Sequence, residues 1–223
     1  MIAPKPVPET REKMYLHGPG DLSRARIEAF IRERFAAIHS AWIDDFLPTL
    51  ISTRNDRSQL LAAAGFQWAS DNPLFLETYL DTPVESCLRE FSHSPVSRQT
   101  IVEFGNLATT TPGEIRKLIL VLASYFGQRG MDWAVLTLTP TLINSFTRLG
   151  LVLHSLAPAR PELLKTSRSY WGRYYDLNPR VVAINVRANK PRLQLLERLS
   201  TTRASLSTSL LPPEPVNDRS LFL

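Results

Sequence analysis

Hydrophobic residues recur along this chain with two periods, and these periods predict its helices and strands. Apolar residues at helical spacing from Ile27 to Trp42 predict an amphipathic helix over 22–45. Apolar and β-branched runs predict strands over 46–52, 58–64, 100–108, 133–138, 151–156 and 181–186. Capping signals predict further helices near Val84, Pro112 and Pro140, and weaker patterns predict helices over 161–165 and 193–199.

This order of elements predicts an α/β (α+β) fold, in which helices flank both faces of a central mixed sheet. The nearly continuous apolar run over 133–138 is typical of a central strand covered on both faces. Four prolines and a Gly-Pro-Gly predict an irregular N-terminal arm over 1–20. We expect the folded domain to cover 21–188 and a flexible basic tail to cover 189–223.

Charge and cysteine content narrow the classes of protein that need to be considered. The chain carries a net charge of +5, and its basic excess lies after residue 150, where 11 Lys and Arg accompany 5 Asp and Glu. No zinc-finger, recognition-helix or RNA-module pattern is present, so no nucleic-acid partner is expected. The basic tail is compatible with peripheral contact to an anionic membrane or an acidic carrier protein. One cysteine and an N-terminus without an apolar leader predict a cytoplasmic location.

A metal site is not expected, because the four histidines have no ligand spacing. His17, His39, His93 and His154 are interpreted as surface or loosely packed residues.

Glu103 is a carboxylate inside an otherwise apolar predicted strand. In regular alternation, Glu103 and Gly105 point to one face of the sheet and Asn106 to the other. A buried carboxylate is costly unless it is paired or hydrogen-bonded, so its position needs a reason. The functional interpretation is a group that binds an amine or acts as a general base. The structural alternative is a salt bridge, for example to an arginine of the first helix.

Two further segments could carry chemistry. Thr109–Gly113 leads into a predicted helix, and the N–H groups at a helix N-terminus suit phosphate. Ser169–Tyr175 places four aromatic residues around a glycine just before a strand. These aromatics either wall a ligand pocket or plug the end of the sheet.

Four stretches resemble the bacterial thermostable hemolysin family. They are FLETYLD at 75–81, VEFGNLA at 102–108, FTRLGL at 146–151 and WGRYYDLNPRVVA at 171–183. The resemblance covers about 25–187 and implies a GNAT-like acyltransferase fold related to the acyl-homoserine-lactone synthases. It therefore implies transfer of an acyl group from an acyl-CoA or acyl-carrier-protein thioester to an amine, with no metal.

The resemblance also assigns roles to residues. The pantetheine arm and the phosphates of the donor would lie along Gly105, Asn106, Leu107, Ala108, Thr109, Thr110, Thr111, Gly113 and Arg116. Glu103 would bind or deprotonate the amine, and the N–H groups of Asn106 and Leu107 would polarise the thioester carbonyl.

The same resemblance leaves the general acid to be found elsewhere. Many GNAT enzymes have a tyrosine that acts as the general acid at the position where this chain has Phe146. Tyr174 and Tyr175 are the candidates by residue type. Glu77 and Trp171 are expected to contact the substrates.

Three functions follow from these observations. The preferred one is an N-acyltransferase that moves a fatty acyl group to a small amine such as an amino acid. The second is a membrane-active haemolytic protein that uses the first helix and the basic tail to bind lipid. The third is a non-catalytic module on the same fold that binds an acyl chain or a carrier protein.

Overall fold

The computed structural model describes residues 13–164 and 168–201, which form a seven-stranded sheet in the order β1-β2-β3-β4-β5-β7-β6. The strands are β1 (Lys13–His17), β2 (Thr49–Arg54), β3 (Leu60–Trp68), β4 (Ile101–Thr109), β5 (Trp133–Leu138), β6 (His154–Pro158) and β7 (Arg180–Asn185). β4 and β5 run parallel, whereas the other neighbouring strands are antiparallel. The sheet is therefore mixed, as the sequence predicts.

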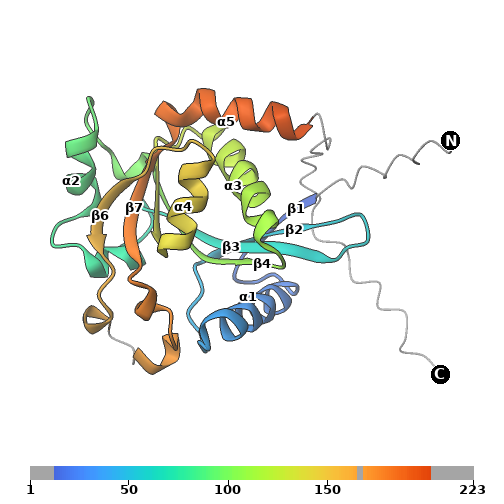
Figure 1. Cartoon of the computed structure of the whole chain (residues 1–223). Coiled ribbons are helices and arrows are strands. Elements are labelled where there is room, and N and C mark those ends of the chain that lie inside the picture. The colour runs from blue at the N-terminus through green and yellow to red at the C-terminus, as the bar shows by residue number, and fades with distance from the viewer. Residues whose placement is uncertain (1–12, 165–167, 202–223) are drawn as a thin grey trace, which may run out of the picture.

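Helices cover both faces of this sheet (Figure 1). They are α1 (Arg24–His39), α2 (Val84–Leu88), α3 (Pro112–Gly127), α4 (Pro140–Arg148) and α5 (Val186–Thr201), with a short 3₁₀ helix η1 (Phe75–Tyr79). The core accordingly has two parts: one packs α3 and α5 against the sheet, and the other packs α1 and η1 against its opposite face. In the described part of the chain, no helix is long and apolar enough to cross a bilayer.

α1 is shorter than the predicted helix over 22–45. Ser40 adopts a left-handed conformation with φ of 54°, and its N–H closes the helix on the carbonyl of Ala36. The apolar stripe through Ile27, Ile31 and Phe35 is buried, as expected for a core helix. Trp42, beyond the end of the helix, is 59% exposed.

The ends of the domain are also more ordered than predicted. Lys13–His17 lies within the predicted irregular arm but forms an edge strand paired with β2. At the other end, 189–201 belongs to α5 rather than to a flexible tail, because Leu193 and Leu196 pack against the core beside α3. The predicted helix over 193–199 is therefore confirmed, although α5 begins earlier, at Val186. β1 depends on tertiary pairing with β2, which its proline-rich local sequence does not reveal. Residues 1–12 and 202–223 lie outside the described residues.

His17 is buried rather than on the surface, which corrects the sequence interpretation. Its Nδ1 contacts Asp21 Oδ2 at 3.1 Å and Ser23 Oγ at 2.7 Å, and its Nε2 contacts Ser52 Oγ at 2.9 Å. Burial lowers the pKa of His17, although Asp21 opposes this shift. These hydrogen bonds connect β1, β2 and the start of α1. Because Ser52 is fully buried, its hydroxyl is not accessible as a nucleophile.

Candidate active site

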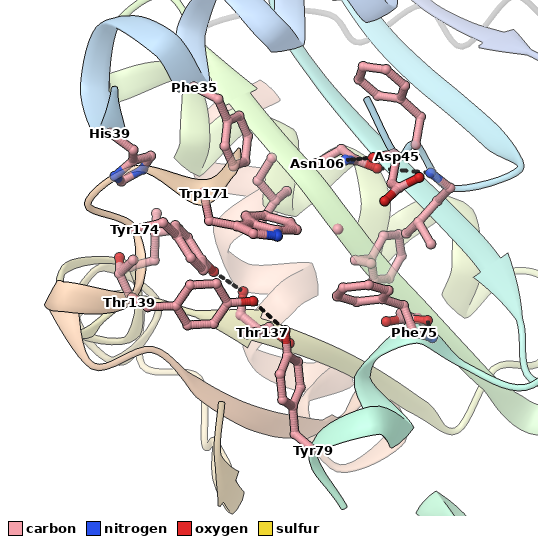
Figure 2. Close-up of a pocket in the computed structure, with 18 residues that line it drawn as sticks. Phe35, His39, Asp45, Phe75, Tyr79, Asn106, Thr137, Thr139, Trp171 and Tyr174 are labelled. Atoms are coloured by element: carbon pink, nitrogen blue, oxygen red, sulfur yellow. Dashed lines mark hydrogen bonds between the residues drawn. The ribbon is translucent and has the colours of Figure 1, made fainter. Parts of the chain in front are cut away.

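β4 and β5 separate at the centre of the sheet, and a pocket occupies the gap between them. The parallel pairing between these strands stops at Phe104 and Leu136, although both strands continue beyond this point. The pocket has a volume of about 160 Å³. Figure 2 shows Trp171 and Tyr174 on one side of it and Phe75 and Asp45 on the other.

The opening begins at a β-bulge in β4. Over this stretch β4 uses one residue more than β3, and Asn106 has a φ of 51°. Asparagine is one of the few residues other than glycine that adopt this left-handed conformation readily. Its side chain fixes the bend, because Oδ1 accepts from the N–H of Leu47 at 3.0 Å and Nδ2 donates to the carbonyl of Asp45 at 3.1 Å.

The bulge brings Asn106 to the same pocket as Glu103, which corrects the prediction that they face opposite sides. That prediction assumed strict alternation along the strand, and the extra residue breaks it. Gly65 on β3 makes the arrangement possible, because a Cβ there would lie 2.7 Å from Asn106 Oδ1 and 2.8 Å from Leu47 Cβ.

Glu103 lies against the pocket with its carboxylate held by three N–H donors. Oε2 accepts from Gln67 Nε2 at 2.7 Å and from the N–H of Phe75 at 2.8 Å, and Oε1 accepts from the N–H of Leu76 at 2.9 Å. Burial raises the pKa of Glu103 to about 6, although these hydrogen bonds oppose the shift. The group is therefore mostly ionised at neutral pH and able to accept a proton.

The alternative explanation for Glu103, an ion pair with an arginine of the first helix, is wrong. The described partners of its carboxylate are amide groups of β3 and η1.

Three tyrosines meet on the other side of the pocket. The hydroxyls of Tyr79 and Tyr175 form a hydrogen bond with each other, and Tyr174 donates to the carbonyl of Thr137 at 3.2 Å. Burial raises the pKa of each of the three phenols, so all are protonated at neutral pH. The hydroxyl proton of Tyr174 is engaged in the hydrogen bond to Thr137. Tyr79 and Tyr175 together have two hydroxyl protons, and their mutual hydrogen bond uses only one of them. That pair can therefore donate a proton into the pocket.

Tyr79 is a site residue that the sequence analysis missed. It belongs to FLETYLD, a motif quoted for the family resemblance, but its partner Tyr175 is 96 positions away. His39, another pocket residue, was also missed, and burial lowers its pKa.

The predicted aromatic segment does wall the pocket, through Trp171, Tyr174 and Tyr175. Gly172 positions this segment against the end of α1. It has a φ of 51°, and a Cβ there would lie 2.3 Å from the carbonyl oxygen of His39. The N–H of Arg173 donates to that same carbonyl at 2.7 Å.

Glu77 lies outside the pocket, although the sequence predicts that it binds substrate. Its carboxylate accepts from Arg98 at 2.6 Å and from the N–H groups of Leu74 and Val84. Burial alone would raise the pKa of Glu77, but these donors lower it to about 2. Its position fits a role in holding η1, the helix whose N–H groups bind Glu103.

The predicted donor-binding residues divide into two groups. Gly105, Asn106 and Leu107 line the pocket, whereas Ala108 to Thr111, Gly113 and Arg116 continue outward along the end of β4 and the start of α3. Thr111 is the N-cap of α3, as the capping signal near Pro112 predicts, but its side chain makes no capping hydrogen bond.

Arg34 reaches this turn from α1, an approach that the sequence analysis did not foresee. Its Nη2 donates to the carbonyl of Thr110 at 3.4 Å. Its Nε is buried and lacks a hydrogen-bond partner in the described structure.

A second, apolar cavity adjoins the first. It has a volume of about 50 Å³ and shares Phe104 and Leu107 with the pocket. Phe146, which occupies the position where many GNAT enzymes have a general-acid tyrosine, lines this second cavity instead of the pocket. Among the described residues, no cluster of His, Cys, Asp and Glu could hold a metal ion.

A comparison with models of protein families identifies the family of this chain. The model described as thermostable hemolysin matches residues 17–190. The chain belongs to this family. A search of curated proteins found no match.

Solved structures similar to this thermostable hemolysin family protein include acyl-homoserine lactone synthases and an N-acyl amino acid synthase. The CoA-dependent acyl-homoserine lactone synthase BjaI, solved with SAM and isopentyl-CoA, has a TM-score of 0.60 at 10% identity, covering 90% of this chain and 95% of its own. FeeM, an N-acyl amino acid synthase from uncultured soil microbes, has a TM-score of 0.55 at 12% identity, with coverages of 85% and 97%.

The AHL synthase LasI has a TM-score of 0.54 at 12% identity, covering 79% of this chain and 91% of its own. At these identities the comparisons establish the fold, which is the GNAT-like fold predicted from the sequence.

Proposed function

We propose that this protein is an N-acyltransferase that moves a fatty acyl group from a CoA or acyl-carrier-protein thioester to a small amine, the class that includes amino acids. The observation that carries the proposal is a buried carboxylate, Glu103, in a pocket between two separated strands. Of the proteins that share the fold, BjaI is described as a CoA-dependent acyl-homoserine lactone synthase and FeeM as an N-acyl amino acid synthase.

In the proposed reaction, Glu103 removes a proton from the amine, whose nitrogen attacks the thioester carbonyl. Neither Asn106 nor Leu107 has a register partner on β3 or β5, so their N–H groups are candidates to stabilise the oxyanion. The carbon–sulfur bond then breaks, and the Tyr79–Tyr175 pair protonates the leaving thiolate.

The two ends of the donor would occupy different parts of the cleft. The acyl chain would enter the second, apolar cavity beside Phe104 and Leu107. The phosphates of CoA, or the phosphate of a carrier protein's pantetheine, would lie at the start of α3 near Arg34 and Arg116.

Acyl transfer from acyl-CoA to a panel of amines, with the products identified by mass spectrometry, tests the proposal. Glu103→Gln should lower kcat/KM about 100-fold or more. In the wild type, kcat/KM should fall as the pH drops through about 6, because protonated Glu103 cannot accept a proton. Glu90→Gln, which alters an exposed carboxyl, should change neither value.

Full activity of Glu103→Gln with an unchanged pH profile would rule out its role as the base. Binding of acyl-CoA with no product from any amine would instead favour the non-catalytic acyl-binding module.

A second candidate, direct membrane activity, is supported by exposed apolar residues beside the pocket. Trp42 and Tyr170 are linked by a backbone hydrogen bond of 2.7 Å and are 59% and 51% exposed. Such residues favour the membrane interface. The apolar stripe of α1 is buried, so that helix does not supply the predicted lipid-binding face. Leakage from anionic liposomes without any acyl donor would favour this second function.

A further inference from the structure

Four aromatic rings form a closed ring of contacts at the pocket. The centroid distances are 6.2 Å for Phe75–Trp171, 5.7 Å for Trp171–Tyr175, 6.5 Å for Tyr175–Tyr79 and 6.0 Å for Tyr79–Phe75. We call these four residues the aromatic box. A group at its centre lies within roughly 6 Å of every ring centroid, which is within the distance range of a cation–π interaction with each ring whose face it meets.

Carboxylates flank the aromatic box. The N–H of Phe75, a member of the box, donates to Glu103 at 2.8 Å, so the buried carboxylate lies directly beside it. Asp45 lines the same pocket and is exposed at its rim (Figure 2). Electron-rich ring faces and two carboxylates both favour a positive charge and oppose a negative one.

We propose that the acceptor is a cationic amine without an acidic group, and that the aromatic box holds its ammonium end. This inference rests on the proposed function and narrows its substrate class. The ammonium first gives one proton to Glu103, which releases it to solvent. The neutral nitrogen then bonds to the acyl carbon and gives a second proton to Glu103 as the carbon–sulfur bond breaks. The thiolate takes a proton from the Tyr79–Tyr175 pair, and the second proton held by Glu103 returns to that pair through solvent, so the products are an amide, a thiol and one released proton.

An amino acid fits this pocket less well than its decarboxylated counterpart. The α-carboxylate lies next to the reacting nitrogen, which must approach Glu103. It therefore enters the field of Glu103 and Asp45, and like charges at close range repel.

Matched pairs of acceptors provide the test. Tyramine is compared with tyrosine and putrescine with ornithine, using the full-length protein and an acyl-CoA donor. The amine of each pair should have a kcat/KM at least roughly tenfold above that of the amino acid. A kcat/KM for an amino acid, or for S-adenosylmethionine, that equals or exceeds the kcat/KM for the amines would overturn the inference. N-acyl transfer itself would still stand.

Binding without a donor separates this inference from the proposed function. Calorimetry should detect choline but not 3,3-dimethylbutanol, its uncharged analogue of similar shape. Selective choline binding without acyl transfer to any amine would support the aromatic box and refute the acyltransferase. Equal binding of the two probes would refute the box.

Variants connect these results to the named residues. Trp171→Leu should abolish choline binding, whereas Trp171→Phe, which keeps a ring, should retain part of it. Asp45→Asn alters an exposed side chain and should reduce the preference for tyramine over tyrosine. An unchanged preference in Asp45→Asn together with unchanged choline binding in Trp171→Leu would overturn the assignment.

Discussion

At the scale of single residues, Gly172 shows how one backbone position supports the pocket. A Cβ at this position would meet the carbonyl oxygen of His39 at 2.3 Å, in addition to the cost of a left-handed conformation. We expect Gly172→Ala to lower the free energy of unfolding by more than about 3 kcal/mol. Urea denaturation measures this loss.

Gly130 provides the matched control for Gly172. It also has a positive φ, at 74°, but a Cβ there would have no atom within 4 Å. Gly130→Ala should therefore cost only the conformational penalty of about 1 kcal/mol. Similar losses in the two variants would show that the contact with His39 is unimportant.

Some individual site residues can be recognised from sequence and others cannot. Glu103 stands out because a carboxylate in an apolar strand is unusual. Tyr79 and Arg34 do not stand out, because a tyrosine or an arginine in an ordinary helical segment has many structural uses. Their positions depend on contacts between distant segments, and no local pattern encodes those contacts.

At the scale of elements, β4 and α3 together form the proposed donor site, and Arg34 of α1 lies beside it. We expect Arg34→Gln to raise the KM for acyl-CoA several-fold with little change in kcat, because phosphate binding contributes equally to the ground and transition states. Steady-state kinetics with acyl-CoA measure the change.

A shorter donor provides the control for Arg34. An acyl-N-acetylcysteamine thioester has no phosphate, so its KM should be the same in the wild type and in Arg34→Gln. An equal rise in KM for both donors would indicate a structural role for Arg34 rather than phosphate binding.

Most elements could be predicted because their periods and caps are local properties. The strands over 133–138 and 181–186 were predicted within one residue of the observed β5 and β7. The bulge at Asn106 could not be predicted, because it depends on Gly65 and Leu47 from other segments. The same bulge explains why the strand was predicted correctly while the direction of Asn106 was wrong.

At the scale of the whole molecule, buried titratable groups make stability depend on pH. The unfolded chain binds a proton at His17 near pH 6.5, whereas burial lowers the pKa of this histidine in the folded state, so the folded protein binds this proton less readily. The free energy of unfolding should therefore fall as the pH drops from 7 to 5. His17→Gln should reduce this slope, and denaturation at several pH values measures it.

Glu103 acts in the opposite direction, because its pKa of about 6 in the folded state lies above the ordinary value of 4.5. As the pH falls through 6, the folded state takes up this proton first and gains stability. The effect of His17→Gln on the pH dependence of stability is therefore best measured in a Glu103→Gln background, where the opposing contribution of Glu103 is absent. An unchanged slope after adding His17→Gln would show that His17 ionises equally in both states.

The separation of β4 and β5 has a consequence for how the molecule responds to its donor. Where the strands part, a sheet seven strands wide lacks a stretch of cross-strand bonding at its centre. A linear ligand that carries amide groups can supply those bonds and act as a temporary eighth strand. The donor would then complete the architecture of the protein, and slower amide hydrogen exchange along β4 and β5 would record its arrival.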